Sequence, residues 1–138
     1  MHITSLYGDY SIGSFGEEAK AWIDFLADCG FSWWQVLPLC PIDECNSPYQ
    51  SHSAFGGNPY LVDLPTLCRE GLLTEEEISH HRQQTPYSCE YVRLYHNRLE
   101  LLRTAAGRAE NRDEIVKWTE ERPYLQQFCQ FMSLIVVN

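Results

Sequence analysis

The stretch that decides the fold runs from residue 31 to residue 39 and reads Phe31-Ser32-Trp33-Trp34-Gln35-Val36-Leu37-Pro38-Leu39. This run is short, almost continuously apolar and rich in aromatic side chains. Such a run is typical of a strand that is buried on both faces, and Pro38 would end it. The sequence therefore predicts a buried strand at this point.

A helix is expected directly before this strand, over about residues 16–29. The spacing of Ser14 and Glu17 fits a capping box at its start, and Gly30 fits the position just after its end. A helix, a tight glycine turn and a buried strand form the second half of a βαβ unit, which predicts an α/β fold. Residues 1–4 are only a stub of the strand that should precede the helix. The apolar face of the helix is expected at Ala19, Trp22, Ile23, Leu26 and Cys29.

Residues 40–60 form a long segment in which three prolines and Gly56-Gly57 exclude regular structure. It follows the carboxyl end of the predicted strand, where α/β proteins bind ligands, and loops of this length are often functional. Its hydroxyls, amides and aromatic faces suit a sugar, which has a polar rim and apolar faces. The alternative is a turn-rich loop whose polar groups satisfy its own backbone. The candidate hydrogen-bonding residues are Asn46, Ser47, Tyr49 and Gln50, and the candidate flat faces are Tyr49, Phe55 and Tyr60.

The rest of the chain is predicted to be mostly helical after a short extended piece at residues 61–64. Thr74 and Glu77 have the spacing of a capping box, and Pro123 fits the first position of the last helix. Helices are expected over about residues 75–82, 91–107, 111–122 and from Pro123 onward. Their inward faces are expected at Tyr91, Leu94, Tyr95, Leu102, Ala105 and Ala106, and in the last helix at Leu125, Phe128, Met132 and Ile135.

The composition argues against several classes of function. The 138 residues include 19 Asp and Glu against 10 Lys and Arg, for a net charge of -9. This acidity argues against a nucleic-acid binder and against binding to an anionic membrane surface. No apolar run approaches the ~20 residues of a membrane span, and no signal-peptide pattern is present. The six cysteines lack C-x-x-C spacing, which favours free, buried thiols in a reducing cytoplasm.

A few further side chains carry groups that can take part in chemistry. They are the trio Cys40, Cys45 and His52, the pair His80-His81, the pair Asp43-Glu44, and Asp63 alone. The trio matches no zinc spacing, so no metal site is assigned, and the two histidines do not share a helix face. The adjacent acids do not fit glycoside chemistry, which needs two carboxylates on opposite sides of one bond. For Asp63, a role in capping a turn is favoured.

Four blocks of sequence stand out together: residues 34–39 (WQVLPL), 47–51 (SPYQS), 53–55 (SAF) and 57–61 (GNPYL), followed by Asp63. In this order and at this separation they resemble the amylomaltases, the bacterial and plant 4-α-glucanotransferases. The resemblance covers most of the chain.

The resemblance implies a partial (β/α)8 barrel with an inserted helical subdomain. Residues 1–64 would supply early barrel elements with the glucan-cleft loop 40–60, and residues 65–138 would form the mostly helical subdomain. It also implies transfer of α-1,4-glucan segments between maltooligosaccharides, or to glucose, through a covalent glycosyl-enzyme without a cofactor. The family's catalytic aspartate, glutamate and second aspartate lie downstream of anything that resembles this chain, so no catalytic residue is assigned here.

Two positions carry over from the family to this loop. Ser47 and Tyr49 match residues that line the glucan cleft near the scissile bond, where the tyrosine packs on a glucose ring and the serine bonds its hydroxyls. Asn46 and Gln50 are further cleft-lining candidates. Glu44 stands where some members have a tyrosine of an accessory glucan site, and Asn46 replaces a usual aspartate.

We therefore expect the N-terminal part of a cytoplasmic glucanotransferase, which begins in a strand stub, stops within a helix and is inactive alone. Its expected partners are maltooligosaccharides, with neither nucleic acid nor membrane. The alternatives are a non-catalytic maltooligosaccharide-binding fragment and a truncated product without function.

Overall fold

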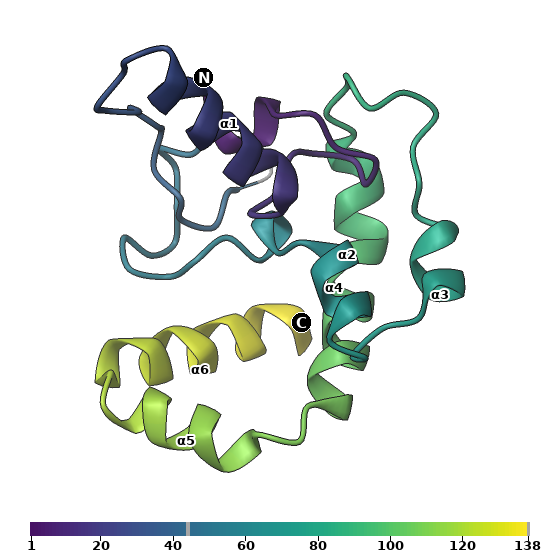
Figure 1. The fold of residues 1–138 in the computed structure, drawn as a ribbon. Helices are drawn as coiled ribbons and strands as arrows, with labels where there is room; N and C mark the ends of the chain where they lie inside the picture. Colours follow the sequence, from purple (N-terminus) through teal and green to yellow (C-terminus); the bar gives the residue numbers. More distant parts are fainter. Residues whose placement is uncertain (44, 138) are drawn as a thin grey trace. The chain divides into compact units, whose positions relative to one another are not determined.

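The computed structural model describes residues 1–43 and 45–137, with side chains as far as residue 134. Predictions that concern Glu44, Asn138 or the side chain of Ile135 lie outside this description. In the described ranges every regular element is a helix (Figure 1). The 3-10 turns are η1 (Ile3–Ser5) and η2 (Pro59–Leu61), and the α-helices are α1 (Glu17–Asp28), α2 (Leu64–Arg69), α3 (Glu75–Ser79), α4 (Tyr91–Arg108), α5 (Arg112–Glu120) and α6 (Pro123–Val137).

The chain divides into two compact units. The first unit comprises Met1–Pro38 and Pro59–Arg108, and the second comprises Leu39–Asn58 and Ala109–Asn138. The predicted domain boundary at residue 64 stays a prediction.

The core of the first unit forms around one stripe of α4. Leu94, Arg98, Leu101 and Ala105 recur at intervals of three and four residues, so they lie on one face of the helix and are all buried. Two predicted members of this face, Leu94 and Ala105, are confirmed, whereas Ala106 is exposed. The core cluster consists of Tyr10, Leu64, Leu73, Ile78, Leu101 and Ala105.

The predicted α/β barrel fold was wrong for this chain, because the described residues contain no strand. The run 31–39 that led to it contains no helix or strand, and its Trp33 is 91% exposed. A strand forms only by pairing with another strand. The stub that should have paired folds instead into η1, which buries Ile3.

The second unit consists of a long loop and a helix pair. α5 and α6 lie side by side (Figure 1). As predicted, α6 begins at Pro123, and its least exposed described side chains are Leu125, Phe128 and Met132. The predicted irregular loop 40–60 is confirmed for its described residues up to Asn58, which form no helix or strand, whereas Pro59 and Tyr60 begin the 3-10 turn η2.

The helix ends show where local sequence patterns hold. Thr74 and Glu77 form the predicted capping box of α3, and Gly30 follows α1 with a φ of 81°, a backbone conformation that favours glycine. The capping box predicted at Ser14 was wrong, because α1 has Gly16 at its N-cap position. The extended piece predicted at residues 61–64 was also wrong, since Asp63 caps the short helix α2 there.

Two predictions from composition can also be compared with the structure. Within the described part of the chain, no helix is long and apolar enough to cross a membrane. All six cysteines are free, but four of them are exposed, so the prediction of buried thiols was wrong.

Candidate functional site

The candidate sugar-binding residues lie on the loop 39–58, which is closed at its base. The Asn58 backbone N–H donates to the Leu39 carbonyl at 2.9 Å, and the Cys40 thiol donates to the Ala54 carbonyl at 3.3 Å. These two bonds hold the two ends of the loop next to each other. The segment between them is therefore a compact loop whose two ends lie close together.

A carboxylate and a hydroxyl shape the turn that carries Ser47 and Tyr49. Asp43 Oδ1 accepts the backbone N–H groups of Cys45, at 3.0 Å, and of Ser47, at 3.3 Å. Ser47 Oγ in turn accepts the backbone N–H of Tyr49 at 3.3 Å. An accepting hydroxyl keeps its own hydrogen for donation, so Ser47 can still donate to a ligand oxygen.

Tyr49 is 71% exposed, so its ring is accessible for stacking. Gln50 is exposed beside it, and Asn46 is half-buried with a φ of 59°, a left-handed conformation that asparagine tolerates. The turn thus brings Asn46, Ser47, Tyr49 and Gln50 together. Their role in lining a glucan cleft stays a prediction.

The alternative interpretation, a loop that satisfies its own backbone, is confirmed for other polar residues of the loop. Asp43 accepts loop amides as described above, and Ser53 Oγ accepts the N–H groups of Phe55, at 3.1 Å, and Gly56, at 2.9 Å. Of the predicted flat faces, Phe55 is exposed. Tyr60 is not available, because it is buried in the first unit with its ring edge-on to Tyr95 at 5.6 Å.

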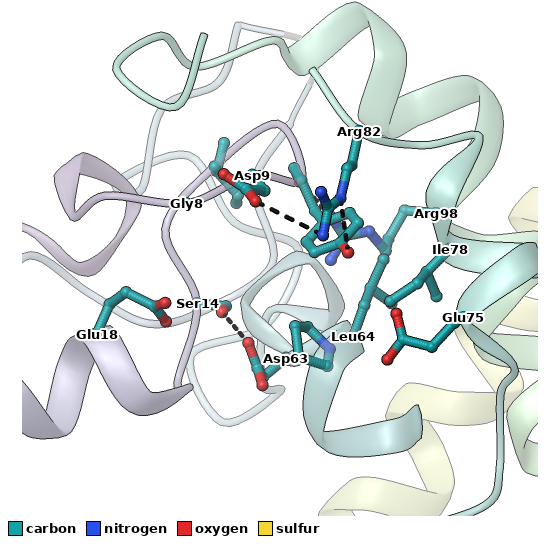
Figure 2. A pocket seen from close by; sticks show the side chains of 13 residues that line it. Gly8, Asp9, Ser14, Glu18, Asp63, Leu64, Glu75, Ile78, Arg82 and Arg98 are labelled. Carbon is teal, nitrogen blue, oxygen red and sulfur yellow. Dashed lines mark hydrogen bonds and ion pairs between the residues drawn. The ribbon is translucent and has the colours of Figure 1, made fainter. Parts of the chain in front are cut away.

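The first unit contains a pocket of its own (Figure 2), whose lining includes Arg98. This side chain is only 4% exposed and donates to the backbone carbonyls of Tyr10 and Val62. Burial lowers the pKa of Arg98 to about 10, while the nearby Asp63 carboxylate opposes that shift. Arg82 lies 4.0 Å from Asp9 and donates to the Tyr10 hydroxyl at 3.3 Å. The charged groups of Arg98, Arg82 and Asp9 are thus engaged with the protein itself.

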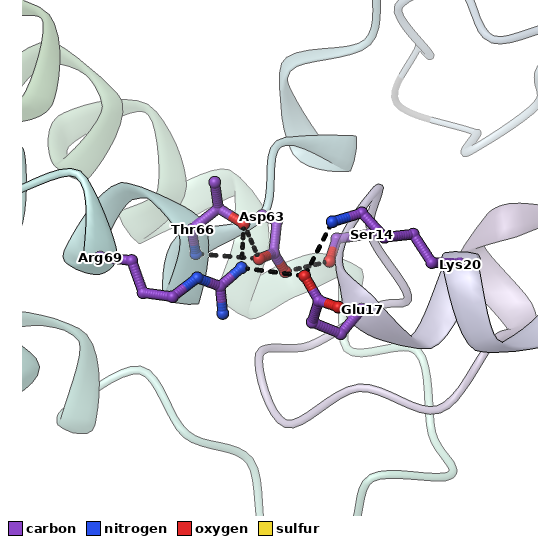
Figure 3. Close-up of polar contacts among 6 residues, drawn as sticks. All are labelled: Ser14, Glu17, Lys20, Asp63, Thr66 and Arg69. Carbon is purple, nitrogen blue, oxygen red and sulfur yellow. Dashed lines mark hydrogen bonds and ion pairs between the residues drawn. The ribbon is translucent and has the colours of Figure 1, made fainter.

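The carboxylate of Asp63 joins two segments of the first unit, the residues before α1 and the start of α2 (Figure 3). Its Oδ1 accepts Ser14 Oγ at 2.6 Å, and its Oδ2 accepts the backbone N–H of Thr66 at 2.9 Å and Thr66 Oγ1 at 2.6 Å. A Cβ on Gly16 would lie 2.4 Å from Asp63 Oδ1, so only glycine fits there. The predicted capping role of Asp63 is confirmed, and Ser14, which has the spacing of a cap, bonds to Asp63 instead.

Sequence reasoning missed Arg98 as the buried cation of this pocket. The available signal was its position four residues after Leu94, within the apolar stripe of α4. No three His, Cys, Asp or Glu side chains gather to hold a metal ion in the described ranges.

Comparison with known proteins now identifies the class of protein. The family model for 4-alpha-glucanotransferases, Glyco_hydro_77, matches residues 1–137. The chain therefore belongs to the 4-alpha-glucanotransferase family, which confirms the resemblance.

Two curated relatives and one solved structure give the extent of the match. The 4-alpha-glucanotransferase of Clostridium butyricum is 36% identical over 97% of this chain and 28% of its own length. That of Thermus thermophilus is 37% identical over 97% of this chain and 27% of its own length. The amylomaltase from Streptococcus agalactiae, solved in complex with acarbose, superposes with a TM-score of 0.88 at 36% identity, over 96% of this chain and 28% of that chain. The chain thus spans about 28% of these relatives' length and corresponds to their N-terminal part.

Proposed function

We propose that this chain supplies one wall of the glucan-binding site of a 4-α-glucanotransferase. In this proposal Tyr49 stacks on a glucose ring and Ser47 donates to its hydroxyls, with Asn46 and Gln50 beside them. The observation that carries it is the exposed Tyr49 ring on a turn fixed by Asp43 and Ser47. Membership of the family, and acarbose bound to a relative of similar fold, support the choice of an α-glucan as ligand.

We further propose that the catalytic carboxylates come from the part of the enzyme to which this chain does not correspond. The complete enzyme would then transfer α-1,4-glucan segments by a retaining, covalent route, in which a sugar acceptor takes the place of water. The chain alone would bind glucan without cleaving it. We place the protein in the cytoplasm, in keeping with its six free cysteines.

The proposal is tested by titrating the 138-residue chain with maltoheptaose in a calorimeter, with the β-linked cellohexaose as the control ligand. We expect saturable heat with a Kd on the order of 1 mM for maltoheptaose, because this chain supplies only one wall of the binding site. We expect no binding heat for cellohexaose. No heat at millimolar maltoheptaose would overturn the binding role. Glucose release from maltotriose by this chain would contradict the placement of the carboxylates elsewhere.

A further inference from the structure

The loop of the second unit lies against one face of α6. Three contacts recur along it: the Phe55 and Tyr124 rings have centroids 5.4 Å apart, and those of His52 and Phe131 are 5.8 Å apart. Between them the Phe128 ring lies against Gly56, where an added Cβ would meet two ring carbons at 2.8 Å. The helix contacts therefore come from residues 124, 128 and 131.

These three helix positions share one face, because residues three and four apart on an α-helix are neighbours. The loop residues that they contact span only residues 52–56. We call this row of rings the seat: it consists of the side chains of residues 124, 128 and 131, and it holds residues 52–56 along the helix. Loops gain a defined position through such contacts with a regular element.

Local hydrogen bonds order the residues between the contacted segment and the candidate binding turn. Ser53 Oγ holds the amides of Phe55 and Gly56, and Ser51 Oγ donates to the Ser53 carbonyl at 2.8 Å. The next residue toward the turn is Gln50, whose backbone N–H donates to the Ser47 carbonyl at 3.3 Å. Residues 51–56 and residues 47–50 are thus each held by their own hydrogen bonds, and they are directly joined in the chain at Gln50 and Ser51.

We propose that α6 is a positioning element for glucan binding: Tyr124, Phe128 and Phe131 seat residues 52–56 and so fix the turn that carries Ser47 and Tyr49. This inference rests on the proposed function and adds α6 to it. Binding groups work only when their geometry is held by the surrounding residues, so release of the seat lowers affinity without removing a ligand contact.

The test compares Phe128→Ala with Trp118→Ala in the 138-residue chain. Both remove an aromatic side chain from the helix pair, but the Trp118 ring stacks under Arg122, with its centroid 4.1 Å from that guanidinium carbon. Two quantities are measured: hydrogen exchange of the amides of Phe55 and Gly56, and the Kd for maltoheptaose. Circular dichroism checks that the helices remain.

Phe128→Ala is expected to speed exchange of the two amides and to raise the Kd, each about tenfold, the change that 1.4 kcal/mol produces. Trp118→Ala, and Phe128→Leu, which keeps an apolar side chain against Gly56, should change both by less than about twofold. If Phe128→Ala loses its helical signal, Phe131→Ala replaces it, because the Phe131 ring is partly exposed and contacts the loop at His52.

The outcomes separate this inference from the proposed function. Unchanged exchange in Phe128→Ala overturns the seat, and faster exchange with unchanged affinity overturns its role in binding. An equal loss of affinity in Trp118→Ala overturns the assignment to this face of α6. If the unaltered chain binds no maltoheptaose, the proposed function and the positioning role both fail, while the exchange rates still decide whether the seat exists.

Discussion

The two units of this chain differ in how far their side chains are buried and in whether buried charges have protein partners. In the first unit a hydrophobic core is present, and charged groups such as Asp63 and Arg98 are buried with protein partners. In the described part of the second unit Pro41 is the one buried apolar side chain, and the aromatic rings stay partly or largely exposed. Stability should therefore reside in the first unit, and ligand binding in the second.

The largest expected effect compares two isoleucines, one in each unit. Ile78 is 1% exposed in the core of the first unit, and Ile115 on α5 is 49% exposed. Ile78→Ala should lower the free energy of unfolding by about 3 kcal/mol, because it removes buried methylenes and leaves a cavity. Ile115→Ala should change it by less than about 0.5 kcal/mol. Urea unfolding followed by circular dichroism measures both, and equal losses would contradict the division between the units.

The next effect concerns the carboxylate that joins segments of the first unit. Asp63→Ala removes the N-cap of α2 and the partner of Ser14, and should lower the free energy of unfolding by about 1–2 kcal/mol. Asp63→Asn keeps an acceptor oxygen for the Thr66 amide and should lose less. The same urea titration decides, and an identical loss in the two variants would show that the cap bond contributes nothing.

A pH effect is expected at Glu77, also in the first unit. Arg108 donates to both of its carboxylate oxygens, at 2.7 and 2.8 Å, and together with Thr74 it lowers the pKa of Glu77 from 4.5 to about 2. Because the folded pKa is the lower one, the stabilisation is present above pH 4.5 and is lost as the pH falls toward 2. Glu77→Gln should therefore be less stable than the unaltered chain at pH 7 and equally stable near pH 2.

The urea midpoints of the two proteins, taken between pH 7 and pH 2, measure this difference. Glu76→Gln, one residue earlier on α3 and exposed, serves as the control and should show no comparable convergence. A constant difference between Glu77→Gln and the unaltered chain at all pH values would contradict the ion pair as its cause.

The smallest effect is expected in the second unit, where Arg122 stacks on Trp118 at the surface. Arg122→Ala should lower the free energy of unfolding by about 0.5–1 kcal/mol, the usual value of an exposed cation–π contact. Lys117→Ala on the neighbouring helix α5 provides a matched loss of charge. If the two variants lose the same amount, the stacking has no measurable value.

Local sequence patterns predicted most of the helices, but not which distant residues pack against them or bond to them. The caps at Thr74 and Gly30 and the start of α6 at Pro123 depend on a few adjacent residues, so they were correctly predicted. Ser14 has the same local spacing as a cap, yet it bonds to Asp63, which is 49 residues away. The run 31–39 has the composition of a strand, but a strand needs a neighbour that is absent from the described residues.

For the candidate site, the sequence predicted the loop and the family but not the bonds that shape the loop. The irregular loop and the family followed from the sequence, because prolines, glycines and the SPYQS block are local signals. The bonds from Asp43 to the Ser47 amide and from Ser53 to the Phe55 and Gly56 amides required the structure. So did the seat on α6, since it joins residues more than 65 positions apart in the chain.

In the proposed function, the loop of the second unit binds α-glucan through Tyr49. This binding is tested by the Kd for maltoheptaose of Tyr49→Ala beside Tyr87→Ala, which removes an exposed tyrosine, 86% accessible, from the first unit. Tyr49→Ala should weaken binding at least about tenfold, because it removes the stacking surface, and Tyr87→Ala should leave the Kd unchanged. Equal affinity of the two variants for maltoheptaose would contradict the account.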